Sequence, residues 1–249
     1  MKKIDFIMGM PVIIEVIDND NFDQVFDYLR QIDKKFSPYK KNSEVTKIND
    51  GRLSTKKRSK EMEEILDLSE KTKKETNGYF NIYRNNYMDP SGLVKGWAIY
   101  KASKILDKMG YQNYYINAGG DIQTKGLNSK NEKWAVGIRN PFNIHENIKI
   151  VYLNGEGIAT SGTYEKGNHI YTPEQKIPDR NFHNTNTNDI VSLTVIGPNV
   201  YEADRFATAT FAMGIKGINF IEKQKELEGY MIERCGIATM TSGFEKYVK

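Results

Sequence analysis

The chain has 249 residues, of which 39% are hydrophobic and 27% are charged, and its formal net charge is +4. This length allows one large domain or two closely packed subdomains, and the composition is that of a folded globular protein. The positive excess is mild and spread over many lysines, so it neither requires nucleic acid nor excludes an anionic small ligand. A single cysteine, Cys235, excludes an intramolecular disulfide and a cysteine-based zinc site.

The start of the chain, MKKIDFIMGMPVIIEV, is interrupted by Asp5 and lacks a small-residue cleavage site. No segment has the apolar length of a transmembrane helix. We therefore expect no membrane span and a cytoplasmic location, or an exported one if a leader has been removed.

The predicted elements begin with a strand over 11–17 and an amphipathic helix over 21–36 with one apolar face. The polar stretch SPYKKNSEVTKINDG is typical of a connection. A second helix starts near Ser59 and stops at Asn77-Gly78, and a third over 93–109 ends at Gly110. The remaining pattern predicts strands at 113–117, 134–138, 148–153 and 190–196, helices at 201–213 and 216–227, and a strand near 229–234.

The strands between 113 and 196 come as hairpins without crossover helices, which favours an α+β fold over a doubly wound α/β fold. No Pro- or Ser-rich linker divides the chain, so we expect residues 1–249 to form a single domain. Residues 172–189 carry the weakest structural pattern and suggest a mobile active-site loop.

The segment EADRFATATFAMG, residues 202–214, places a carboxylate in an apolar helix. On a helical wheel Glu202, Arg205 and Ala209 share the expected solvent side, whereas Asp204 and Thr208 lie off it. A buried carboxylate needs a cation, hydrogen-bond donors or a metal. Oxygen ligands at i and i+4 suit one hard cation such as Mg²⁺, but an Asp bonded to a neighbouring backbone is the alternative.

Two glycine-containing stretches resemble ligand-binding turns. In DPSGLVKG, residues 89–96, the N–H groups at a helix start and Lys95 favour an anion, and a capped helix with an exposed lysine is the alternative. In INAGGD, residues 116–121, the pair Gly119-Gly120 allows close approach of a ligand, but an ordinary hairpin turn is favoured.

Two polar stretches hold the other candidates. In GIATSGTYEKGNHIYTP, residues 157–173, His169 is a possible general base, and a structural histidine is the alternative. Ser161 lacks a GxSxG elbow, which argues against a serine hydrolase. In FSPYKKNSEVTKIN, residues 36–49, Tyr39 could lie against an aromatic ligand and Asn49 could bond a polar edge, or the stretch is a solvated loop.

Taken together and in order, these stretches resemble the FAD:protein FMN transferases, the ApbE-type flavin transferases. The resemblance spans residues 8–214 and rests on MGMPV, FSPY…SEVTKIN, NGYFN, DPSGLVKG, INAGGDI, WAVGI…P, IATSGTYEKGNHI and EADRFATATFAMG. It implies an ApbE-type fold of mixed antiparallel sheets with packed helices, in T-fold-like subdomains.

The resemblance also implies a function. Such proteins bind FAD and, with Mg²⁺, transfer its FMN half to a Thr or Ser hydroxyl of a target flavoprotein and release AMP. The implied metal ligands are Gly92, Asp204 and Thr208, and the implied base is His169. The implied cofactor contacts are Met8, Tyr39, Tyr79, Phe80, Asn81, Asp89, Lys95 and Ile170. The stretches described above add Asn49, Gly119 and Gly120 as candidate contacts.

The chain departs from the family pattern in three places. Asn81 and Thr172 stand where members often carry an acid, and the stretch between Asn81 and Asp89 is short. These departures leave two alternatives, an Mg²⁺-dependent FAD pyrophosphatase and a non-catalytic flavin-binding protein. A nucleic-acid partner is not expected, because no aromatic-basic module is visible.

Overall fold

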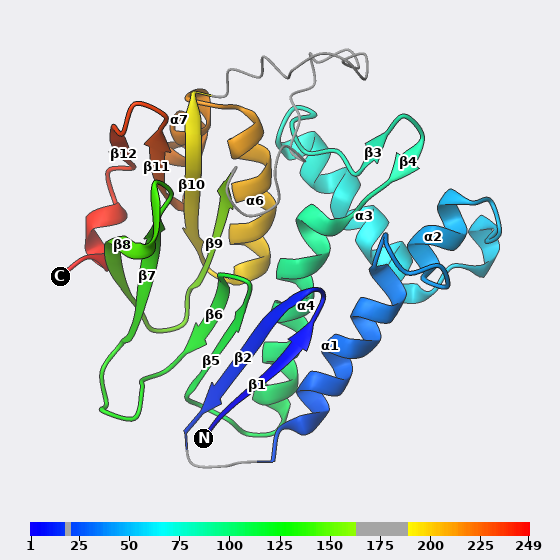
Figure 1. Ribbon diagram of the computed structural model, residues 1–249, viewed down its shortest axis with the longest axis horizontal. Helices are drawn as coiled ribbons and strands as arrows, with labels where there is room; N and C mark the ends of the chain where they lie inside the picture. The colour runs from blue at the N-terminus through cyan, green and yellow to red at the C-terminus, as the bar shows by residue number, and fades with distance from the viewer. Residues whose placement is uncertain (18–20, 163–188) are drawn as a thin grey trace.

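The computed structural model describes residues 1–17, 21–162 and 189–249 (Figure 1). Its strands are β1 Lys2–Ile7, β2 Met10–Val16, β3 Tyr83–Arg84, β4 Tyr87–Met88, β5 Tyr114–Ala118, β6 Asp121–Lys125, β7 Trp134–Asn140, β8 Asn143–Leu153, β9 Gly157–Gly162, β10 Ile190–Gly197, β11 Glu228–Glu233 and β12 Ala238–Met240. Its α-helices are α1 Asp23–Phe36, α2 Glu44–Asn49, α3 Lys60–Glu75, α4 Ser91–Lys108, α6 Val200–Ala212 and α7 Lys216–Glu222. Two short 3₁₀ helices, η1 and η2, span Thr55–Lys57 and Phe244–Tyr247.

One sheet organises these elements. Its eight strands lie in the order β1-β2-β5-β6-β9-β10-β11-β12, and every neighbouring pair is antiparallel. The central pair β6–β9 shares only two register positions, Ile122 with Ile158 and Gln123 with Gly157, so it joins two four-stranded halves. The expected antiparallel hairpins are therefore confirmed.

Each half of the sheet is covered by its own helices. α4 packs on β5 and β6, α6 packs on β9 and β10, and the two helices pack against each other (Figure 1). The opposite face of the second half is covered by the β7–β8 hairpin and η2, whose apolar side chains share a cluster with Ile122, Ile158 and Ile196. No helix in the described ranges is long and apolar enough to cross a membrane.

Helix α6 differs from the prediction on one of its sides. The side expected to face solvent is buried, because Arg205 is only 3% exposed and Ala209 is fully covered. α3 packs against this side and supplies polar partners for the guanidinium, as described below. A helical wheel assigns Arg205 to the surface because its side chain is charged. The wheel contains no information about the partners that the side chain finds in the fold.

Several elements are absent from the predictions. The polar connection contains α2, whose first turn is capped by Ser43 through a 3.0 Å bond from the Thr46 N–H. β1, β6 and β9 were not predicted either. β6 is polar in sequence yet central in the sheet, and its Gln123 is satisfied internally, donating to Gly155 O at 2.9 Å and accepting from Val200 N–H at 2.8 Å. The helix predicted over 216–227 ends at Glu222.

Candidate functional site

The contact between α4 and α6 is built on two glycines one turn apart. Gly92 and Gly96 lie on one face of α4, since residues at i and i+4 share a face. A Cβ at Gly96 would lie 2.6 Å from Asp204 Cβ and 2.8 Å from Val200 O, and one at Gly92 would lie 3.0 Å from Thr208 Cγ2. The missing side chains therefore let the backbone of α4 approach the side chains of α6.

Asp204 and Thr208 meet this glycine face directly. Asp204 is 4% exposed, and its Oδ2 accepts a hydrogen bond of 2.8 Å from the Gly96 N–H. Thr208 Oγ1 donates to Gly92 O at 3.2 Å. The structure thus places a carboxylate and a hydroxyl of α6 against two backbone groups of α4 that lie more than a hundred residues away in the chain.

This donor set has the chemistry of a hard-cation site. All three groups are oxygen ligands, which Mg²⁺ and Ca²⁺ prefer, and one of them carries a full negative charge. A metal site made only of His, Cys, Asp and Glu side chains does not occur among the described residues, where no group of three or more such side chains is close enough to hold an ion. An ion bound here would therefore need the carbonyl and hydroxyl oxygens as ligands beside the carboxylate.

Lys95, one residue before Gly96, lies in a buried ion pair. Its Nζ is 2.8 Å from Asp121 Oδ2, and the two side chains are 15% and 1% exposed. Asp121 Oδ1 also accepts a 3.4 Å bond from Thr160 N–H. The alternative with an exposed lysine is therefore wrong, because the ammonium of Lys95 pairs with the buried carboxylate of Asp121.

Two tight turns lie at the same end of the sheet as Asp121. Met8 and Gly9 join β1 to β2, and Gly119 and Gly120 join β5 to β6, all four with positive φ, as two-residue type I′ hairpins require. The favoured hairpin interpretation of the glycine pair is confirmed. A Cβ at Gly119 would lie 2.6 Å from Met10 Sδ, so the two turns pack against each other.

The loop after α3 brings an aromatic side chain to the α4 glycines. Thr76 Oγ1 accepts a bond of 3.1 Å from Phe80 N–H, and the buried Phe80 ring lies 3.6 Å from the position of a Cβ on Gly92. Tyr79 beside it is half-buried. Asn81 is exposed, and its Oδ1 accepts from Tyr83 N–H at 3.0 Å, so its amide holds the local turn.

The segment that leads into α4 is held from α2. Asn49 Nδ2 donates to Met88 O at 2.9 Å, and Asn49 Oδ1 accepts from Met88 N–H at 2.8 Å. The next residue, Asp89, is exposed and accepts from Ser91 N–H at 3.0 Å. Asn49 therefore acts in the structure as a positioning residue for Asp89, because both ends of its amide are engaged.

Tyr39 is set apart from the other candidates. Its side chain is 92% exposed on the connection between α1 and α2. Across the described ranges, no hydrogen bond or ring contact joins this side chain to another candidate residue. His169 and Ile170, and the loop predicted over 172–189 apart from Asp189, lie outside the described residues.

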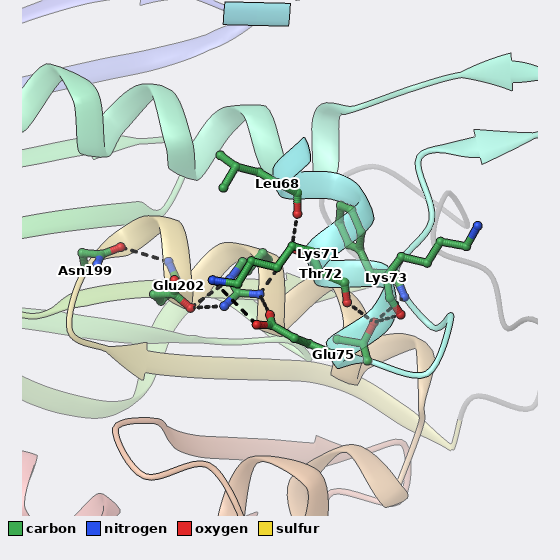
Figure 2. A network of polar contacts seen from close by, with 10 residues as sticks. Leu68, Lys71, Thr72, Lys73, Glu75, Asn199 and Glu202 are labelled. Carbon is green, nitrogen blue, oxygen red and sulfur yellow. Dashed lines mark hydrogen bonds and ion pairs between the residues drawn. The ribbon is translucent and has the colours of Figure 1, made fainter. Parts of the chain in front are cut away.

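An ion network behind Asp204 was not predicted. Arg205 Nε donates to Glu202 Oε2 at 2.8 Å, and its Nη1 bonds Glu75 Oε2 and, at 3.3 Å, Thr72 Oγ1. Figure 2 shows Thr72 and Glu75 of α3 facing Glu202 of α6. Burial acts to lower the pKa of Arg205, but its bonds to Glu75 and Glu202 and their charges raise it above the usual value. The network joins the C-terminal end of α3, from which Tyr79 and Phe80 follow, to α6.

Arg205→Ala is expected to lower the free energy of unfolding by about 3 kcal/mol, the low end for breaking a buried ion pair, because the glutamates left behind are partly exposed. Urea unfolding measures the change. Arg205→Lys should recover part of the loss, since an ammonium cannot bridge two carboxylates as a guanidinium does. Arg30→Ala, which breaks two exposed ion pairs, is the control and should leave the midpoint nearly unchanged. An equal effect of both alanine variants would contradict this role.

Sequence reasoning therefore missed three residues around the site: Gly96 as a contact glycine, Asp121 and Arg205. Gly96 and Asp121 lie inside stretches that the sequence had already indicated. The signal for Asp121 was Lys95, because a lysine that is buried at a helix start needs an anionic partner. Arg205 gave no such signal, because its partners on α3 lie about 130 residues away in the chain.

Comparison with solved structures shows the fold. The chain superposes on the ApbE protein from Thermotoga maritima with a TM-score of 0.84 and 20% identity, over 100% of this chain and 99% of that one. It superposes on the flavin transferase ApbE from Vibrio cholerae with a TM-score of 0.81 and 20% identity, over the same shares. The predicted α+β fold of the ApbE type is confirmed.

Comparison of sequences gives curated relatives. The FAD:protein FMN transferase of Salmonella typhimurium is 28% identical over 159 residues, which are 60% of this chain and 43% of that protein. The FAD:protein FMN transferase of Haemophilus influenzae is 27% identical over 173 residues, 66% of this chain and 48% of that protein. The matched stretch thus spans less than half the length of either relative. The sequence model of the ApbE family matches residues 8–86 and 83–231, which is most of the chain. This protein is therefore a member of the ApbE family.

Proposed function

We propose that this protein is an Mg²⁺-dependent FAD:protein FMN transferase, which moves the FMN half of FAD onto a Thr or Ser hydroxyl of a target flavoprotein and releases AMP. The observation that carries the proposal is the meeting of Asp204, Thr208 and Gly92 O across the α4–α6 contact. Family membership and the named activity of the relatives support it. Gly92 lies on a helix that packs on the first half of the sheet, and Asp204 and Thr208 lie on a helix that packs on the second. We therefore further propose that residues 1–249 act as one domain.

The metal would be held by Asp204, Thr208 and Gly92 O. Bound there, Mg²⁺ would offset the charge of a pyrophosphate and of the departing phosphate. Asp204 supplies the negative charge of the site, and its bond from Gly96 N–H fixes the direction of the carboxylate. Thr208 and Gly92 add neutral oxygens from facing helices, so the two helices must stay in contact for the set to exist.

FAD binding is assigned to the residues that surround this contact. The first turn of α4, where backbone N–H groups and the helix dipole favour a phosphate, is followed directly by Lys95, whose ammonium pairs with Asp121. The half-buried Tyr79 and, set apart from the contact, the exposed Tyr39 offer aromatic surface to an isoalloxazine ring, and the buried Phe80 is proposed to support the site beside Gly92. The other proposed contacts are Met8, Asn81, Asp89, Gly119, Gly120 and Ile170, and Asn49 is proposed to act indirectly, by positioning Asp89.

The transfer step needs a base. The acceptor hydroxyl oxygen forms a bond to the phosphorus of the FMN half, and the bond from that phosphorus to the oxygen of AMP breaks. His169 is proposed to take the proton of the hydroxyl, since a histidine titrates near neutral pH. AMP leaves with the bridging oxygen.

His169→Ala is expected to keep FAD binding and to lower transfer by about 10² to 10⁴-fold, the usual contribution of a general base. FAD affinity is measured by fluorescence quenching, and transfer by the mass of the acceptor. His145→Ala, which changes an exposed histidine of β8, serves as the matched control. Transfer at the wild-type rate in the His169 variant would assign the base to another residue.

One experiment separates this function from its alternatives. The protein is incubated with FAD, MgCl₂ and candidate flavoproteins, with EDTA in a parallel sample, and the acceptor is examined by intact mass spectrometry. A mass increase of one FMN residue that EDTA prevents supports the transferase. AMP and free FMN without a modified acceptor would instead support an FAD pyrophosphatase. A yellow protein that releases no AMP would support a flavin-binding protein without turnover.

The proposed place of action is the cytoplasm. The single cysteine, Cys235, is an exposed free thiol, which suits a reducing compartment. Fractionation of cells with antibody detection tests this part of the proposal, and recovery from an extracytoplasmic fraction would contradict it.

A further inference from the structure

Positive charge is concentrated in one part of the chain. Residues 34–60, here called the basic lobe, hold ten Lys and Arg against two acidic residues, a net charge of +8. The whole chain carries +4, so the remaining residues carry −4. The expectation of an even spread of lysines is therefore wrong. Composition hides the asymmetry because acidic residues elsewhere cancel most of it.

The basic lobe presents this charge to solvent. It comprises the end of α1, α2, η1 and the first residue of α3, and α2 lies at the outer edge of the molecule, away from the sheet (Figure 1). Three of its cations pair with acids: Lys35 with Glu61, Lys40 with Asp33 and Arg52 with Asp50. Within the described part of the chain, no ion pair involves the exposed side chains of Lys34, Lys41, Lys56, Lys57 and Lys60.

Among the described residues, the hydrogen bonds that hold the basic lobe together do not use the side chains of these lysines. Glu44, one of its two acids, accepts bonds of 2.7 Å from both Ser59 N–H and Ser59 Oγ, and so ties α2 to the start of α3. Like charges on exposed lysines repel each other and weaken the compact state. A surface that keeps such an excess is best explained by a partner of opposite charge.

The basic lobe borders the proposed site. Asn49 of α2 pairs with the backbone of Met88, and Tyr87 Oη donates to Pro38 O at 3.5 Å. β4 therefore lies against the lobe, and Gly92 follows four residues after Met88. A protein that offers a hydroxyl at the α4–α6 contact would come close to the basic lobe as it docks.

We propose that the basic lobe is the docking surface for an acidic face of the acceptor protein, an inference that rests on the proposed transferase function. The charges are too exposed and too spread for a buried small-molecule site, but they suit the long-range attraction that speeds and orients protein association. Single-stranded nucleic acid fits less well, because binding it requires several stacking aromatics. Of the two aromatic residues in the lobe, Phe36 is buried and only Tyr39 is exposed.

The test uses probes that do not depend on turnover. A fluorescent Thr-containing peptide with a run of glutamates is compared with the same peptide carrying glutamines, and binding is followed by anisotropy at low and at physiological salt. The triple variant Lys41→Glu/Lys56→Glu/Lys57→Glu removes charge from the basic lobe. Lys130→Glu/Lys133→Glu/Lys225→Glu makes the same change in net charge at exposed positions elsewhere.

The wild type and the control variant are expected to bind the glutamate peptide about tenfold more tightly than the glutamine peptide at low salt, and the lobe variant should lose this difference. FAD affinity should be unchanged in both variants. Equal binding of the two peptides by the wild type, or equal losses in both variants, would overturn the proposal. Tighter binding of oligo(dT) than of the glutamate peptide, if the lobe variant loses it, would also overturn the proposal. If the wild type still prefers the glutamate peptide but transfers no FMN, the transferase function is overturned and the docking surface is not.

Discussion

Asp204→Asn is expected to lower FMN transfer by about 10³-fold, which corresponds to about 4 kcal/mol of lost transition-state stabilisation. Asparagine has the shape of aspartate, and its carbonyl can still accept the 2.8 Å bond from Gly96 N–H. The change therefore removes the negative charge while the contact between α4 and α6 is kept. The rate is measured from the modified acceptor at several Mg²⁺ concentrations, and a higher Mg²⁺ requirement should accompany the loss.

Two controls separate loss of the metal site from loss of the fold. Asp107→Asn removes a carboxylate from the same protein near the far end of α4, about 22 Å along the helix from Gly92, and should leave transfer unchanged. Thr208→Val should raise the Mg²⁺ concentration that transfer requires, whereas Thr210→Val, which removes a hydroxyl bonded within α6, should not. Near wild-type transfer by the Asp204→Asn protein would show that this carboxylate holds no ion during turnover.

Gly96→Ala is expected to reduce both stability and activity. In a helix this change is ordinarily favourable by about 1 kcal/mol. Here the new methyl group would lie 2.6 Å from Asp204 Cβ and 2.8 Å from Val200 O, and backbone cannot move aside as a flexible side chain can. Overpacking of this kind costs about 1–3 kcal/mol, so the free energy of unfolding should fall. Transfer should fall by more than the loss of folded protein accounts for, because separating the helices moves Asp204 away from Gly92 O.

Gly92→Ala provides the graded comparison. Its methyl group would meet Thr208 Cγ2 at 3.0 Å and Phe80 Cε2 at 3.6 Å, which are side-chain atoms at milder distances. The loss of stability, measured by urea unfolding, should therefore be smaller than at Gly96. If both alanine variants were as stable as the wild type, the close approach of α4 and α6 would not depend on these glycines.

Much of the fold could be predicted because its determinants are local. The apolar face of α1, the stop at Asn77-Gly78 and the glycine pair between β5 and β6 each depend on a few neighbouring residues. β6 and β9 could not be predicted in the same way. Their polar residues survive in the middle of a sheet because distant groups satisfy them, as Val200 N–H satisfies Gln123.

The family could be identified without knowledge of contacts, because the order of the motifs is a property of the sequence, and the same stretches supplied Asp204, Thr208 and Gly92 as candidates. The folded chain was needed to show that Thr208 meets Gly92 O, that Lys95 pairs with Asp121, that Arg205 is not a surface residue, and that Asn49 holds the backbone of Met88. One cause underlies all four findings. Burial and charge pairing depend on which distant segments pack together, and a helical period or a motif does not contain that information.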